Sequence, residues 1–80
     1  MEDSKRRLAE KQVHEDALMA MSKWRKLGTV GIDHILKDMG YAATTMYCFQ
    51  KKANGFILTI DAYVLLMGQS RRLDTKVEEV

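Results

Sequence analysis

The sequence has no proline and a single cysteine, and each scarcity excludes a class of structure. Without proline, the strongest helix breaker and most rigid turns are missing. The lone thiol of Cys48 cannot close a disulfide within the chain, which indicates a reducing compartment. No apolar run approaches the roughly 20 residues that cross a bilayer, and the charged N-terminus is not followed by the apolar segment of a secretion signal. We therefore expect a cytoplasmic protein that does not enter a membrane.

Length and composition indicate one small folded domain. The chain has 80 residues, of which 46% are hydrophobic and 30% charged, which is typical of a folded domain and not of a disordered one. Because so short a chain buries little, a core with a partner surface is expected in place of an enclosed active site. The whole chain has a net charge of +2, and residues 17–72 hold eight basic and three acidic side chains. This balance suits phosphate contact as well as an ordinary solvated surface.

The apolar spacing predicts an all-α fold, a compact bundle of four to five helices. The first helix is expected over residues 3–27, because apolar side chains recur every three to five positions from Leu8 to Leu27. Gly28 follows at the place of a left-handed C-terminal cap. Trp24, near the end of this helix, is expected to anchor it to the core.

The centre of the chain is interpreted as three further helices. A second helix, capped by Thr29, would end at Gly40, where a sharp turn into a third helix over about 44–53 needs the positive φ that glycine tolerates. A fourth helix would begin after Thr59. The stretch GFILTI, residues 55–60, also has strong β character. Since no second convincing strand is visible to pair with it, the helical interpretation is preferred.

Apolar residues also stand at the offsets around Gly40 that pack a helix-turn-helix unit. They are Ile35, Met39, Tyr41, Met46 and Phe49. With them, the stretch IDHILKDMGYAATTMYCFQK at 32–51, followed by LTIDAYVLLMG at 58–68, resembles the lambda-repressor/Cro-type helix-turn-helix family of phage and bacterial regulators. The resemblance implies a sequence-specific DNA-binding transcriptional regulator, and it leaves activator or repressor open.

In such a regulator the helix at about 44–53 would enter the major groove of double-stranded DNA, with the protein acting as a homodimer. The chain would divide into a projecting first part of the N-terminal helix at 1–16, the DNA-binding domain at 17–72 and a flexible tail at 73–80. The side chains placed to contact bases or phosphates are Thr29, Lys37, Thr44, Thr45, Tyr47, Cys48, Lys51 and Lys52. Threonines can read base edges, whereas lysines would engage phosphates.

A second interpretation is a helical protein-interaction module that binds no nucleic acid. The apolar stripe from Val13 to Leu27 would then lie in the groove of a partner or against a second copy of the chain. The six methionines support this view, because methionine adapts to uneven partner surfaces. The two interpretations differ in salt response, since DNA binding weakens steeply as salt rises.

Catalytic and metal chemistry find little support. His14, His34 and Cys48 each stand alone, whereas zinc ligands normally come in close pairs. The sequence shows no Ser–His–Asp order and no glycine-rich phosphate loop. We expect neither an enzyme nor a protein that needs a cofactor, a metal or a small-molecule substrate.

Overall fold

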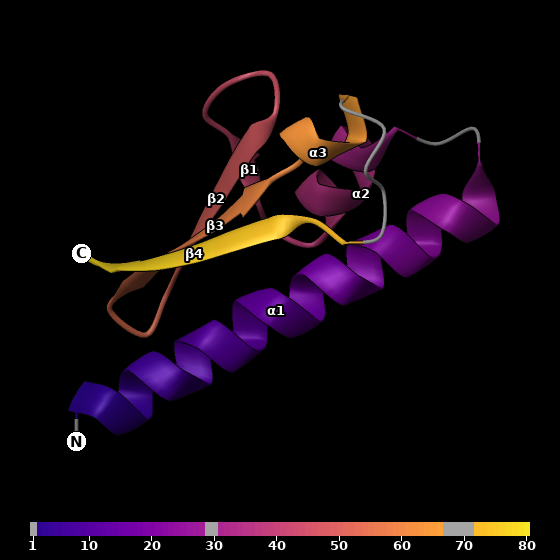
Figure 1. Ribbon diagram of the computed structural model, residues 1–80. Coiled ribbons are helices and arrows are strands. Elements are labelled where there is room, and N and C mark those ends of the chain that lie inside the picture. Colours follow the sequence, from indigo (N-terminus) through magenta and orange to yellow (C-terminus); the bar gives the residue numbers. More distant parts are fainter. Residues whose placement is uncertain (1, 29–30, 67–71) are drawn as a thin grey trace.

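The computed structural model describes residues 2–28, 31–66 and 72–80, which form three helices and a four-stranded antiparallel sheet (Figure 1). In chain order the elements are α1 (Glu2–Leu27), α2 (Ile32–Asp38), β1 (Ala42–Ala43), β2 (Cys48–Ala53), β3 (Phe56–Asp61), α3 (Tyr63–Leu66) and β4 (Asp74–Glu79). The predicted all-α bundle is therefore wrong. The region expected to hold its third and fourth helices forms the centre of the sheet.

Helix α1 follows the prediction closely, because nothing in its 26 residues interrupts it. Its buried side chains recur at helical spacing and pack against the sheet: Ala9, Val13, Ala17, Ala20 and Met21. Gly28 has a φ of 62° and donates its N–H to the carbonyl of Trp24 at 2.9 Å, as expected of a left-handed cap. The apolar stripe is thus used largely by the protein's own core, and Trp24 packs against that core as a half-buried side chain.

Helix α2 also forms, and Gly40 has the predicted positive φ, at 95°. Its buried face consists of Ile35 and Leu36. After the glycine the chain does not start a second helix. Tyr41 enters the core, and the short strand β1 follows. The bend is therefore correct, but the predicted helix-turn-helix is wrong.

The two central strands are joined by a two-residue turn, which explains why no helix forms here. Asn54 and Gly55 have φ values of 55° and 85°, the positive pair that a type I′ hairpin turn requires. The register places Ala53 opposite Phe56 and Phe49 opposite Ile60. An Asn-Gly pair between apolar runs is the strongest local signal for a hairpin, so β2 was the missing partner of the β-rich stretch at 55–60.

One face of the sheet forms the core and packs against α1 (Figure 1). The strands order as β1-β2-β3-β4, and the core side chains alternate along them: Phe49, Phe56, Leu58, Ile60 and Val77. The opposite face is polar. There Gln50 Nε2 donates to Thr59 Oγ1 at 3.2 Å, and Lys76 lies 3.3 Å from Glu78.

The C-terminal segment, expected as a flexible tail at 73–80, instead contains the edge strand β4. The first part of α1, expected to project, lies along it: Ala9 is buried, and Arg6 Nη2 donates to the carbonyl of Val77 at 3.1 Å. This bond satisfies a backbone acceptor on the edge strand, where unpaired groups otherwise invite pairing with another chain.

Candidate functional site

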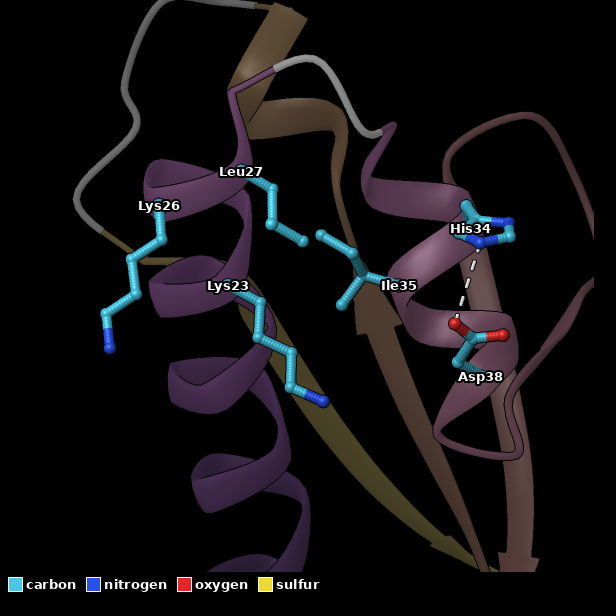
Figure 2. Close-up of a pocket in the computed structure, with 6 residues that line it drawn as sticks. All are labelled: Lys23, Lys26, Leu27, His34, Ile35 and Asp38. Carbon is cyan, nitrogen blue, oxygen red and sulfur yellow. Dashed lines mark ion pairs between the residues drawn. The ribbon is translucent and has the colours of Figure 1, made fainter.

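The groove between α1 and α2 is the candidate site (Figure 2). Its volume is about 380 Å³, and its described lining residues are Lys23, Lys26, Leu27, His34, Ile35 and Asp38. The apolar part is formed by Leu27 and Ile35, which point toward each other from the two helices in Figure 2. Leu27 is 53% exposed although it belongs to a helix that faces the core elsewhere.

Charged side chains surround this apolar floor. Lys23 extends into the space between the helices, whereas Lys26 points to the other side of α1 (Figure 2). On α2, His34 Nε2 lies 3.6 Å from Asp38 Oδ2, and both side chains are largely exposed. Such a surface pair contributes little to stability, so its groups remain available to a ligand at small cost. Lys23 gives the α1 side of the groove a positive charge, and Lys26 adds positive charge at its outer rim.

The residues predicted to read DNA do not form one surface. Thr29 lies outside the described residues. Lys37 is exposed on α2, and Lys52 is exposed on β2. Because neighbouring residues of a strand point to opposite faces, Lys51 and Lys52 cannot act together. Lys51 is held internally: its Nζ donates to the carbonyl of Met39 at 3.2 Å and lies 5.5 Å from the centre of the Tyr41 ring.

Of the remaining predicted residues, Thr44 and Tyr47 make side-chain contacts within the chain, and Cys48 is a half-buried residue of β2. Thr44 and Thr45 are exposed in the loop after β1, where both N–H groups donate to the carbonyl of Cys48, at 2.8 and 3.4 Å. The Thr44 hydroxyl donates to the same carbonyl. Half-buried Tyr47 packs edge-on against Tyr63, with ring centres 5.9 Å apart. These interactions shape a loop and do not present a recognition helix.

Two core predictions from the same stretch have opposite outcomes. Phe49 is fully buried, as expected, whereas Met46 is 77% exposed, so its predicted place in the core is wrong. Met46 lies in the loop that leads into β2, where no helix carries it inward.

A buried polar pair between α1 and the segment after α2 was missed by the sequence analysis. Tyr41 Oη donates to Asp16 Oδ2 at 2.6 Å, and Gln12 Nε2 donates to Asp16 Oδ1 at 2.9 Å. Burial and the hydrogen bond to Asp16 raise the pKa of the Tyr41 hydroxyl well above its usual range. The available signal was position, because Asp16 lies three residues after Val13, on the buried side of α1.

Further structural findings narrow the possible chemistry. Within residues 2–28, 31–66 and 72–80, no three histidine, cysteine or acidic side chains gather as metal ligands would. Another cavity, of about 360 Å³, lies on the polar face of the sheet. It is lined by Cys48, Thr59, Asp61, Asp74, Thr75 and Lys76. Among the helices of the described segments, none has the length and apolar character needed to cross a bilayer.

Comparisons of the chain with protein-family models, with curated proteins and with solved structures gave no match.

Proposed function

We propose that the chain is a protein-interaction module, and that the groove between α1 and α2 binds a short acidic segment of a partner protein through one apolar side chain. The observation that carries the proposal is the exposed apolar contact of Leu27 with the edge of buried Ile35, flanked by Lys23 and Lys26. An apolar anchor with a charged rim is the usual anatomy of a protein-binding surface.

The charge of the groove defines the class of partner. A leucine or phenylalanine of the partner would cover Leu27 and Ile35, while a carboxylate beside it would approach Lys23, which extends into the space between the helices. Asp38, the acidic side chain among the described lining residues, lies on the α2 side of the groove, 3.6 Å from His34 and across from Lys23. Complementary charge at such a rim mainly speeds association and selects among partners.

Binding of double-stranded DNA stays a prediction of the sequence resemblance. The helix that was to enter the major groove is absent, since 48–53 is a strand and 44–47 lies in a loop. Of the basic residues assigned to DNA, Lys51 donates to the carbonyl of Met39, and Lys52 points to the opposite face of the sheet. The protein-interaction proposal needs no such helix, and it uses a surface that the described residues form.

A titration followed by NMR tests the proposal. The probe is a short acetylated peptide with a leucine between glutamates, compared with the same peptide carrying lysines and with random-sequence duplex DNA. We expect the acidic peptide alone to shift the amide signals of Leu27 and Ile35. In the variant Lys23→Glu/Lys26→Glu, the dissociation constant should rise at least about fivefold, because repulsion replaces attraction.

The matched control is Lys52→Glu, which makes the same type of charge change on the polar face of the sheet. It should bind the acidic peptide like the parent. If the two peptides bind equally, or if Lys52→Glu weakens binding as much as the groove variant, the groove is not the binding site. Steeply salt-dependent binding of the duplex through the same residues would replace the proposal with phosphate recognition.

A further inference from the structure

The outward face of α1 carries a second pattern, which the core does not use. Its members are exposed and follow one another at spacings of four, three, four, three and four residues: Ser4, Leu8, Lys11, Glu15, Leu18 and Ser22. Alternating steps of four and three keep side chains on one stripe of a helix and are the spacing of a coiled-coil seam. In Figure 1, α1 runs along one side of the molecule, and no described element covers its other side.

The stripe is complementary to a second copy of itself that runs in the opposite direction. Reversed about residue 13, it places Leu8 on Leu18, Lys11 on Glu15 and Ser4 on Ser22. We propose that α1 is the dimer interface of this protein: two copies pair their outward faces antiparallel, with Lys11 of each chain against Glu15 of the other and Leu8 against Leu18.

The exposed apolar side chains of α1 support a second copy of the chain as the partner. Leu8 is 65% and Leu18 46% exposed, and Met19, beside the stripe, is 51% exposed. In the antiparallel arrangement Leu8 meets both Leu18 and Met19 of the second copy, so each end of the seam gains an apolar cluster. These are the large apolar side chains that α1 leaves uncovered before its C-terminal turn.

Charge also selects the antiparallel orientation. In a parallel pair Lys11 would face Lys11 and Glu15 would face Glu15, which repels at both positions. Within the described residues neither side chain forms an ion pair in its own chain. They stand four apart with the lysine first, which is the less favourable order for a pair within one helix. In the antiparallel dimer, Lys11 of each chain pairs with Glu15 of the other chain, which gives two ion pairs.

The geometry allows the contact without displacing the fold. The stripe from Ser4 to Ser22 spans about 27 Å at 1.5 Å per residue, within a molecule 41 Å long. It lies opposite the side of α1 that covers the sheet, so the two sheets would end up on the outer sides of the pair. The two grooves near Leu27 would lie at opposite ends, both accessible. Dimerisation itself does not depend on the proposed function of those grooves.

A charge-swap series followed by sedimentation equilibrium tests the interface. The parent should show a concentration-dependent dimer. Lys11→Glu or Glu15→Lys should each raise the dissociation constant at least about tenfold, because like charges then meet at the centre of the seam. The double variant Lys11→Glu/Glu15→Lys restores opposite charges and should dimerise like the parent. A mixture of the two single variants should form heterodimers.

The control is Lys23→Glu, a change of the same sign on another face of α1, and it should leave the dimer unchanged. Circular dichroism checks that every variant keeps its helix. A parent that stays monomeric at millimolar concentration overturns the proposal. So does a dimer that tolerates both single swaps, which would point to pairing at the free edge of β4 instead.

Orientation is tested by crosslinking in a Cys48→Ala background. Ser4→Cys and Ser22→Cys proteins, mixed and oxidised, should form a disulfide between the two different variants. Each variant alone should stay uncrosslinked. Efficient crosslinking of each variant to itself would indicate parallel helices and contradict the antiparallel seam.

Discussion

Removing one hydroxyl, in Tyr41→Phe, tests the buried contact that fixes α1 to the rest of the fold. In the parent, Tyr41 Oη lies 2.6 Å from Asp16 Oδ2, and both side chains are at least nine-tenths buried. The substitution leaves the ring in place and takes away one donor. Asp16 then keeps a single hydrogen bond, from Gln12.

The magnitude follows from the state of the carboxylate. A hydrogen bond to a charged group contributes roughly 1.5–3 kcal/mol, and a buried acceptor that loses its donor is costly, so we expect a loss of about 2 kcal/mol. For a domain of this size each kcal/mol lowers the melting temperature by about 4–8 °C. Tyr41→Phe should therefore melt roughly 10 °C below the parent.

Thermal unfolding followed by circular dichroism measures this shift. Tyr63→Phe is the matched control, because Tyr63 is 48% exposed and loses the same hydroxyl on the surface. Surface substitutions usually change stability by less than about 0.5 kcal/mol. If the two variants melt within about 2 °C of each other, the contact between Tyr41 and Asp16 does not hold α1 in place.

Two further predictions concern pH and the hairpin. Because folding raises the pKa of the Tyr41 hydroxyl, this group contributes its full stabilisation below its unfolded pKa, near 10, and less at higher pH. In urea unfolding between about pH 8 and pH 11, the free energy of unfolding should therefore fall more steeply for the parent than for Tyr41→Phe. Gly55→Ala should destabilise by about 1–2 kcal/mol, because an alanine at a φ of 85° is strained. In the same urea unfolding Asn54→Gly should be nearly neutral, and equal effects of the two changes would contradict the assigned turn.

The sequence patterns predicted the helices α1 and α2 correctly, but they wrongly predicted helices where the structure has strands β2 and β3. Gly28 and Gly40 end helices with positive φ, as expected from their place after apolar stripes. Three of the apolar residues that predicted a helix-turn-helix are buried in the structure: Ile35, Tyr41 and Phe49. Over so short a run, steps of two along a strand and steps of three or four along a helix select overlapping residues, so burial alone does not distinguish them.

The decisive local signal was the turn. Asn54 and Gly55 form the turn between β2 and β3, and the helix predicted over about 44–53 left the stretch at 56–61 without its partner strand. Strand β4 gave no comparable signal. Val77 is its single buried residue. Because only one of its side chains enters the core, the sequence of this edge strand resembles a polar tail.

The candidate groove could not be predicted in the same way. It arises where Leu27 of α1 and Ile35 of α2 line the same cavity, and that arrangement depends on how the two helices pack in three dimensions. Neither residue is unusual in sequence, and both belong to ordinary apolar stripes. The outward stripe of α1, by contrast, is visible in the sequence once its buried stripe is known and can be set aside.

The rotation of α1 about its axis links these surfaces. Successive residues turn by about 100°, so a helix lodged one residue out of register would bury other side chains and turn Lys11 and Glu15 from the outward face toward the flank of the helix. Apolar contacts along the buried face are non-directional and tolerate small rotations, whereas the hydrogen bond from Tyr41 to Asp16 fixes one point of the circumference. The proposed dimer seam therefore depends on this buried bond. Tyr41→Phe should therefore weaken dimerisation as well as stability. A loss of stability alone would show that the apolar face suffices to hold the helix in register and would contradict this link.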